Sequence, residues 1–126
     1  MRVLVCGGRE FQDAVNLEAS LDAFHQGPRG PIELVIHGGA RGADCIAGEW
    51  AKSRCVACVV YEANWAAEGR SAGPIRNKQM LDEGMPDLII AFPGGRGTAN
   101  MTRQARDRGL EVLEIRVSTD IGPGSL

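Results

Sequence analysis

Apolar residues in this chain gather in five short runs, which are separated by longer stretches where they recur every three or four positions. Short β-branched runs bounded by glycine or polar residues predict buried strands, and the longer periodic stretches predict helices. Strands are predicted at 3–5, 33–36, 57–61, 87–92 and 111–115, and helices at 13–24, 43–54, 74–82 and 98–108.

This alternation of strands and helices runs along the whole chain. It is typical of an α/β fold in which helices cover both faces of a parallel sheet. We predict a single Rossmann-like three-layer domain with a mostly parallel five-stranded sheet over residues 1–117, followed by a C-terminal tail at 118–126. The polar segment 62–73 interrupts the alternation and is expected to run over the surface.

Size and composition narrow the class of protein. A chain of 126 residues suits one domain with its own hydrophobic core. The net charge of −2 predicts no broad electropositive surface, which disfavours binding to nucleic acid. No apolar run is long enough to cross a bilayer, and the N-terminus lacks a signal-peptide pattern. We therefore expect a soluble, cytoplasmic protein that does not contact membranes.

The four cysteines are Cys6, Cys45, Cys55 and Cys58, and we expect them to be reduced in a cytoplasmic chain. Cys55 and Cys58 form a C-x-x-C pair, but no second ligand pair stands at a spacing suited to zinc, so no metal site is predicted. We interpret Cys58 as a small hydrophobe packed in its strand. A redox dithiol is the other interpretation of the pair.

Glycine-rich turns follow three of the predicted strands. They are Gly7-Gly8-Arg9, Gly38-Gly39-Ala40-Arg41-Gly42-Ala43-Asp44 and Pro93-Gly94-Gly95-Arg96-Gly97-Thr98. The carboxyl ends of parallel strands share one edge of the sheet, where open α/β sheets bind ligands. Glycine lets the backbone come close to a ligand, and the free amides at a helix N-terminus favour an anion.

Each of these turns also carries an arginine. Arg9, Arg41 and Arg96 can each offer a fork of donors to phosphate or carboxylate. One glycine turn alone could serve only the fold. Three such turns on one edge favour a binding site for a nucleotide or a nucleotide-like anion. A phosphate ligand could bring Mg²⁺ with it, although no metal motif stands out.

Four segments together resemble the SLOG superfamily, which groups the LOG-type phosphoribohydrolases with the DprA/Smf proteins, and within it the YspA-type branch. The segments are Gly7-Gly8-Arg9-x-Phe11, His37 to Asp44, Ala72-Gly73-Pro74-Ile75-Arg76-Asn77 and Pro93 to Thr98. They occur in the expected order over nearly the whole chain. The resemblance implies a Rossmann-like fold and, since enzymes of this superfamily commonly work as dimers, a homodimer.

The LOG-type enzymes cleave a nucleoside 5′-monophosphate into free base and ribose 5-phosphate. Their motif is P-G-G-x-G-T-x-x-E, with an upstream R-K-x-x-M. The segment from Pro93 to Thr98 matches the glycine turn, and Arg76 matches the upstream arginine. Asn77 replaces the lysine, and Met101 occupies the position of the glutamate. This chain therefore departs from the enzymes at the residue that supplies a carboxylate.

That departure affects the chemistry, because cleavage of an N-glycosidic bond builds positive charge on the ribose. A carboxylate can stabilise that charge or activate water, and methionine can do neither. The candidate catalytic residues are therefore Arg76 and Asp44, with Glu62 as a further carboxylate. Capping of a helix is the other interpretation of Asp44.

Other residues allow two interpretations. Arg76 and Asn77 are expected to reach over a ligand from a helix that follows Gly73. His37 could act as an acid or base or could simply end a strand. Trp65 could stack on a base, although packing or a dimer contact is favoured. Three arginines are interpreted as a solvated helix face: Arg103, Arg106 and Arg108.

The function expected from these observations is a binding module or sensor for a nucleotide-derived ligand, such as an ADP-ribose-like or NAD-related molecule. The alternative is a nucleoside 5′-monophosphate phosphoribohydrolase. A DprA-like role with single-stranded nucleic acid is disfavoured by the net charge of −2 and by the lack of aromatic stacking platforms.

Overall fold

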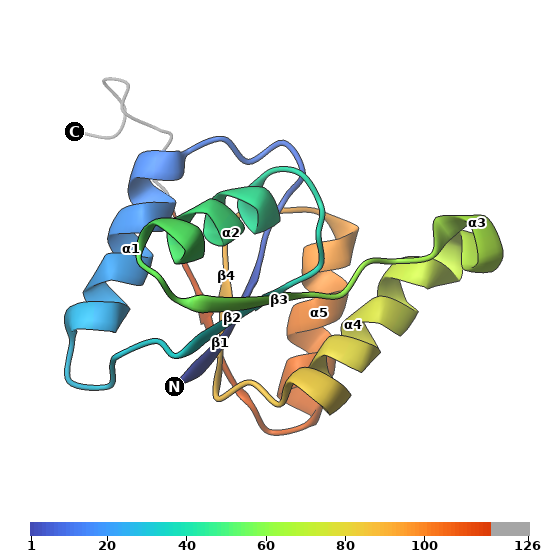
Figure 1. Cartoon of the computed structure of the whole chain (residues 1–126). Coiled ribbons are helices and arrows are strands. Elements are labelled where there is room, and N and C mark those ends of the chain that lie inside the picture. The colour runs from blue at the N-terminus through green and yellow to red at the C-terminus, as the bar shows by residue number, and fades with distance from the viewer. Residues whose placement is uncertain (117–126) are drawn as a thin grey trace, which may run out of the picture.

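The computed structural model describes residues 1–116, so the predicted tail at 118–126 lies outside the described residues. The strands are β1 (Arg2–Cys6), β2 (Leu34–His37), β3 (Ala57–Val60), β4 (Leu88–Ala91) and β5 (Glu111–Glu114). The helices are α1 (Ala14–Gln26), α2 (Ala43–Ser53), α3 (Trp65–Glu68), α4 (Ala72–Gly84) and α5 (Arg96–Asp107), with a 3-10 turn, η1 (Gly69–Ser71), between α3 and α4 (Figure 1).

The five strands form one sheet in the order β3-β2-β1-β4-β5, and every neighbouring pair is parallel. The chain therefore starts in the middle of the sheet, builds outward to β3, and then returns across β1 to add β4 and β5. The strand order reverses between the neighbours β1 and β4, which lead into helices on opposite faces of the sheet. The predicted parallel five-stranded α/β fold is confirmed.

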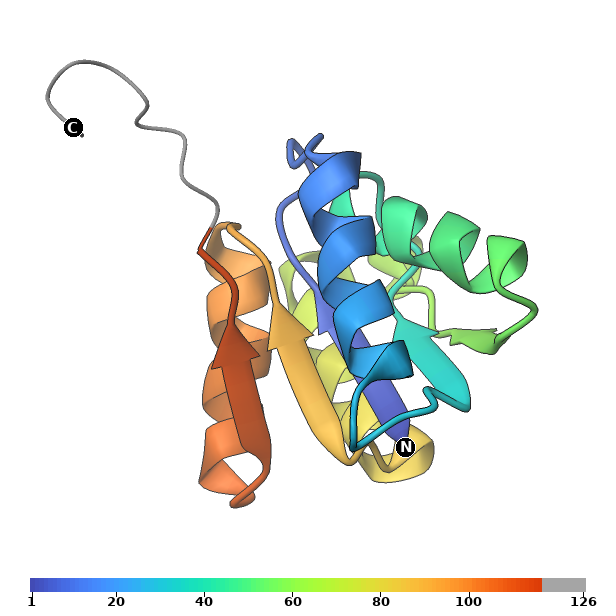
Figure 2. The same ribbon diagram turned by 90° about the vertical axis from the view of Figure 1, so that its left-hand side faces the viewer.

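Helices cover both faces of the sheet, as the views in Figures 1 and 2 show. Alternate residues of β1 point to opposite faces, as the pleat of a strand requires. Val3 and Val5 belong to the core under α1 and α2, whereas Leu4 and Cys6 belong to the core under α4 and α5. Continuous apolar runs such as Leu88–Ala91 are buried throughout, because both faces are covered.

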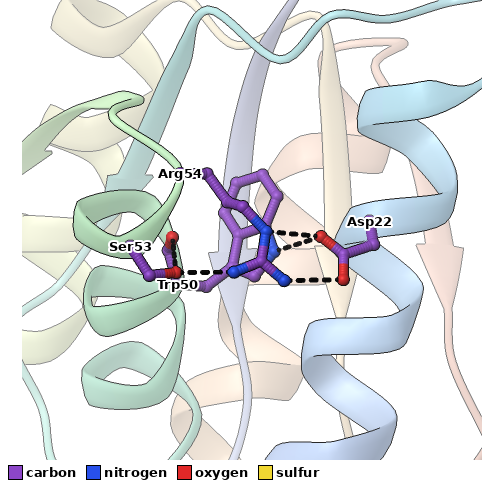
Figure 3. Close-up of polar contacts among 4 residues, drawn as sticks. All are labelled: Asp22, Trp50, Ser53 and Arg54. Carbon is purple, nitrogen blue, oxygen red and sulfur yellow. Dashed lines mark hydrogen bonds and ion pairs between the residues drawn. The ribbon is translucent and has the colours of Figure 1, made fainter.

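A cluster of polar side chains connects α1 to α2, next to the core that these two helices cover (Figure 3). Both carboxylate oxygens of Asp22 accept hydrogen bonds from Arg54, at 3.0 and 2.8 Å, and one also accepts from the indole Nε1 of Trp50 at 2.9 Å. These bonds hold the pKa of Asp22 below its usual range. The cluster satisfies the polar atom of Trp50, whose side chain is otherwise enclosed in the core.

The segment 62–73 runs over the surface as expected, since residues 64–71 are exposed, and it also contains the short helix α3 and the turn η1, with α4 starting at Ala72. One expectation needs correction. Cys58 does not pack as a small hydrophobe, because β3 is an edge strand and its Cys58 side chain is exposed. All four cysteines are free thiols, and only Cys6 is buried. Among residues 1–116, no helix is both long and apolar enough to span a membrane.

Candidate functional site

The three glycine turns lie together at the carboxyl edge of the sheet, because they follow the adjacent parallel strands β2, β1 and β4. Backbone hydrogen bonds join them directly. The amide of Gly8 donates to the carbonyl of Pro93 at 2.8 Å, and the amide of Ala43 donates to the carbonyl of Gly8 at 3.2 Å. The first turn thus bridges the other two, which fixes the relative position of the starts of α2 and α5.

Close packing explains several of these glycines. A Cβ atom on Gly7 would lie 2.5 Å from the Cβ of Ala43, and one on Gly94 would lie 2.6 Å from the amide nitrogen of Gly8. Gly42 has a φ of +82°, and a side chain there would also collide with the carbonyl oxygen of Gly8. These positions require glycine for the fold itself, because the turns approach one another too closely for a side chain.

Gly95 and Gly97 differ from the other glycines of the turns. A Cβ atom built on either of them would meet nothing within 4 Å, and neither has a positive φ. Both residues line a cavity of about 830 Å³ between the glycine turns, α3, α4 and α5. Neither packing nor backbone conformation requires glycine at these two positions. Their missing side chains leave the backbone open to that cavity.

The cavity gathers many of the predicted site residues. Its walls include these members of the predicted set: Gly7, Gly8, Arg9, Asp44, Arg76, Asn77, Gly95, Arg96, Gly97 and Thr98. Its volume falls within the range of about 300–1,000 Å³ that is typical of small-molecule sites. Two arginines that no sequence motif marks also line the cavity, Arg70 of η1 and Arg103 of α5.

Asp44 organises the second turn. It lies in the first turn of α2, but its Oδ2 atom accepts hydrogen bonds from the amides of Gly38 at 3.0 Å and Ala40 at 3.3 Å, which precede the helix. The carboxyl group thus folds the glycine turn back onto α2. Burial raises the pKa of Asp44 to about 6, against the lowering effect of the Ala40 amide and of the charge on Arg76.

Arg76 and Asn77 extend from α4 to the other elements. Arg76 donates to the carbonyl of Gly38 at 2.6 Å and to Oδ1 of Asn77 at 3.0 Å. Asn77 in turn donates to the carbonyl of Gly97 at 3.2 Å and to Oδ1 of Asn100 at 3.1 Å. Burial and the nearby charge of Arg9 lower the pKa of Arg76, while Asp44 raises it. The pair therefore links the second and third turns across the cavity.

None of the arginines of the cavity has an acidic partner among the described residues, whereas most arginines elsewhere do. Within residues 1–116, no carboxylate lies at ion-pair distance from any of the five that line the cavity: Arg9, Arg70, Arg76, Arg96 and Arg103. Five others do pair with acidic side chains: Arg29, Arg41, Arg54, Arg106 and Arg108. Asp44 is the single carboxylate of the cavity wall. Five arginines against one carboxylate give the cavity a formal charge of +4, although the whole chain carries −2.

Arg9 makes a contact of a different kind. Its guanidinium carbon lies 5.3 Å from the ring centroid of Trp65, which is a cation–π arrangement. Trp65 begins α3, and its indole is about half exposed at the wall of the cavity. The segment 62–71 thus brings an aromatic ring to the site.

Other predicted residues lie outside the cavity walls. Arg41 pairs with Glu10 at the exposed surface, and Gly39 lies beside the side chain of Glu62. His37 is buried, and its Nδ1 accepts from the amide of Gly39 at 3.0 Å. Burial lowers the pKa of His37, with a further contribution from Arg76. The structure therefore does not bring Arg41, Glu62 or His37 to the walls of this cavity. Four more predicted residues also lie outside the cavity walls and hold the turns together by hydrogen bonds or close packing: Gly38, Gly42, Pro93 and Gly94.

Met101 and Cys6 are buried residues that line part of the cavity wall. Met101 is buried in the core under α4 and α5, so no polar group stands where the LOG-type motif has glutamate. Burial raises the pKa of the Cys6 thiol to about 12, which keeps it protonated and poorly nucleophilic. Residues 1–116 hold no group of three or more His, Cys, Asp or Glu side chains able to bind a metal ion.

Comparison with known proteins agrees with the fold. A family model described as the YspA, cpYpsA-related SLOG family matches residues 1–67, which include the first two glycine turns and Trp65. The Gene 61 protein of Mycobacterium phage D29 is similar, with 38% identity over 122 residues that cover 90% of this chain and 95% of the relative.

A solved structure with the same fold is DNA processing protein A (DprA) from Streptococcus pneumoniae. The TM-score is 0.76 at 16% identity, and the match covers 95% of this chain and 52% of that chain. The present chain therefore spans about half the length of that protein. At this identity the likeness concerns the fold alone.

Proposed function

This chain belongs to the YspA, cpYpsA-related SLOG family, and from that premise we propose that its cavity binds a nucleotide or a nucleotide-derived ligand as a sensor or binding module. The observation that carries the proposal is the set of five unpaired arginines around one cavity. Clustered like charges repel one another, so such a set favours an anionic ligand that compensates them. Phosphate groups match the forked geometry of arginine.

The open glycines support phosphate as the anion. Gly95 precedes α5 and Gly97 lies in its first turn, where backbone amides have no partner within the helix. The absence of side chains there would let a phosphate oxygen approach those amides, and Thr98 and Arg96 stand beside them at the wall. The volume of about 830 Å³ leaves room for a base and sugars as well as phosphate.

The proposal is tested by titration calorimetry and thermal shift with AMP, ADP, ADP-ribose and NAD. We expect at least one of them to bind and to raise the melting temperature. Arg96→Gln should weaken binding at least about tenfold, because a charge-assisted hydrogen bond to phosphate is lost. Arg29→Gln is the matched control, since Arg29 pairs with Glu111 outside the cavity. Equal loss in both variants, or no binding by any of the four compounds, would contradict the proposal.

A second candidate function is cleavage of the N-glycosidic bond of a nucleoside 5′-monophosphate. It is favoured by the position of Asp44 in the cavity wall with a pKa raised to about 6, near the range that suits a general base. Oδ2 holds the second turn, and Oδ1 accepts no hydrogen bond from the described residues. Asp44 would activate a water molecule that adds to C1′ of the ribose, while the base leaves with its electron pair and takes up a proton.

Chromatography of each ligand after incubation separates the two candidates. A sensor returns every bound compound intact. A phosphoribohydrolase releases free base and ribose 5-phosphate, and Asp44→Asn should then abolish release while leaving binding in place. Base release that survives in both Asp44→Asn and Arg76→Ala would rule out the mechanism with these two residues.

A further inference from the structure

Trp65 is the aromatic residue of the cavity wall, and we propose that it recognises the base of the ligand by stacking, which makes it a specificity-determining residue. This inference rests on the proposed function, since it assumes that a phosphate-bearing ligand occupies the cavity. It goes further by assigning the ligand an aromatic heterocycle and by locating where that ring lies. A phosphorylated sugar without a base would meet the arginines but leave the indole unused.

The position of the indole supports this role. The ring is about half exposed, although tryptophan is generally well covered in folded proteins. A Cβ atom on Gly73 would lie 3.3 Å from Cη2 of Trp65, so the glycine at the start of α4 allows the edge of the indole to lie against the backbone. The ring therefore packs against the start of α4 at Gly73, while about half of the residue stays exposed to solvent.

Arg9 covers a face of that ring in this structure. Arg9 and Trp65 both line the cavity, so a ligand there can meet the guanidinium as well as the ring. Arg9 has no acidic partner within residues 1–116, and an exposed cation–π contact is weak. A phosphate group would attract the guanidinium more strongly than the indole does. The arginine can therefore turn to phosphate and leave its place on the ring to a base.

The chain offers a direct optical readout for this step. It contains two tryptophans, and Trp50 is buried and hydrogen-bonded to Asp22 on the opposite face of the sheet. Trp65 is therefore the one tryptophan that a ligand in the cavity can touch. A base stacked on it should quench its fluorescence, whereas Trp50 should not respond.

The experiment compares AMP with ribose 5-phosphate, which carries the same phosphate and sugar but no base, and ADP with inorganic pyrophosphate. Dissociation constants are measured by calorimetry and fluorescence is followed in parallel. We expect AMP to bind about 5- to 150-fold more tightly than ribose 5-phosphate, as stacking of a base on an aromatic side chain allows. AMP should also quench the fluorescence, and ribose 5-phosphate should not.

Two substitutions of Trp65 complete the test. Trp65→Leu should abolish both the preference for AMP and the quenching, and leave the affinity for ribose 5-phosphate unchanged. Trp65→Phe should restore part of the preference, because phenylalanine still stacks. Val15→Ala is the control, since Val15 is exposed on α1 away from the cavity.

The failures of the two proposals differ. If AMP and ribose 5-phosphate bind equally well and Trp65→Leu changes neither, base recognition by Trp65 is wrong while the anion site stands. If Trp65→Leu weakens both ligands alike, Trp65 supports the cavity and does not read the base. If none of these phosphates binds, the proposed function and this inference both fall.

Discussion

The carboxyl group of Asp44 shows how one residue can serve the fold at a cost in stability. Its hydrogen bonds from Gly38 and Ala40 shape the second glycine turn, yet burial disfavours its charged form and raises its pKa from 3.8 to about 6. The folded state therefore holds a proton that the unfolded state loses at lower pH. The contribution of this proton to the free energy of unfolding is complete below pH 3.8, and it is lost as the pH rises through about 6.

This sign leads to a prediction for Asp44→Asn. The amide oxygen of asparagine can accept from both backbone amides without carrying a charge. Relative to wild type, the variant should gain on the order of 2–3 kcal/mol in unfolding free energy between acidic and mildly alkaline pH, the equivalent of about two pKa units.

The measurement is denaturant unfolding of both proteins across that range. Asp107→Asn, at an exposed site at the end of α5, provides the control for the removal of a carboxylate. Asp44→Asn should also bind phosphates more tightly, because it removes the single carboxylate of the cavity wall. A free-energy difference between Asp44→Asn and wild type that does not change with pH would show that Asp44 titrates normally.

Individual site residues were only partly predictable. The sequence indicates Arg9, Arg76 and Arg96 because they stand in or near glycine motifs. Arg70 and Arg103 carry no such signal, since their place in the cavity depends on how η1 and α5 pack in three dimensions. The sequence also cannot show that the arginines of the cavity have no acidic partner, because ion pairs depend on how the chain folds. The sequence groups Arg103 with Arg106 and Arg108 as a solvated helix face, but Arg106 pairs with Glu114 and Arg108, which follows α5, pairs with Asp82.

At the scale of elements, the residue type at the start of α5 affects both the stability of the helix and the access of a ligand to its amides. Gly97 lies in the first turn of the helix, and a side chain there would meet nothing within 4 Å. Gly97→Ala should therefore raise the stability of the unliganded protein by about 0.4–1 kcal/mol, because alanine restricts the unfolded chain and favours the helix. It should at the same time weaken nucleotide binding, because a methyl group would then project into the cavity.

Gly109→Ala is the counterpart of this variant. Gly109 follows α5, has a φ of +74° and also faces open space, but it lies outside the cavity wall. Alanine there is strained by the backbone conformation, so the variant should lose stability and keep its affinity. Denaturant unfolding and calorimetry of both variants give opposite signatures if the proposal holds. A Gly97→Ala protein that is stabilised and binds as wild type would show that no ligand approaches that amide.

The sequence located most elements closely but missed α3. Regular apolar spacing reveals a helix that packs on a core, and α1 or α2 show it clearly. None of the residues of α3 is buried, so no periodicity marks it. Asn64 caps the helix by accepting a hydrogen bond from the Ala67 amide at 3.2 Å. The exposure of Cys58 was missed for a related reason. An apolar run predicts a strand, but it does not tell whether that strand lies at the edge of the sheet.

At the scale of the whole molecule, the arrangement of charge separates the site from the rest of the surface. The chain carries a net charge of −2, whereas the cavity wall carries a formal +4. Ion pairs such as Arg29 with Glu111 and Arg54 with Asp22 neutralise cations elsewhere. A small anion is therefore attracted to one edge of the sheet, and a long polyanion gains little beyond it because the rest of the chain carries a net negative charge.

This contrast predicts selectivity for small phosphorylated ligands over single-stranded nucleic acid. Binding along a strand needs a continuous cationic groove and several stacking platforms, and Trp65 is the single aromatic side chain of the cavity wall. We expect ADP to bind at physiological ionic strength, with affinity that falls moderately as salt is added. A labelled oligothymidylate should show no change in fluorescence anisotropy under the same conditions, and excess oligonucleotide should not displace ADP. Salt-sensitive oligonucleotide binding that ADP competes away, and that Arg96→Gln abolishes, would show instead that the cavity is an entry point for a strand.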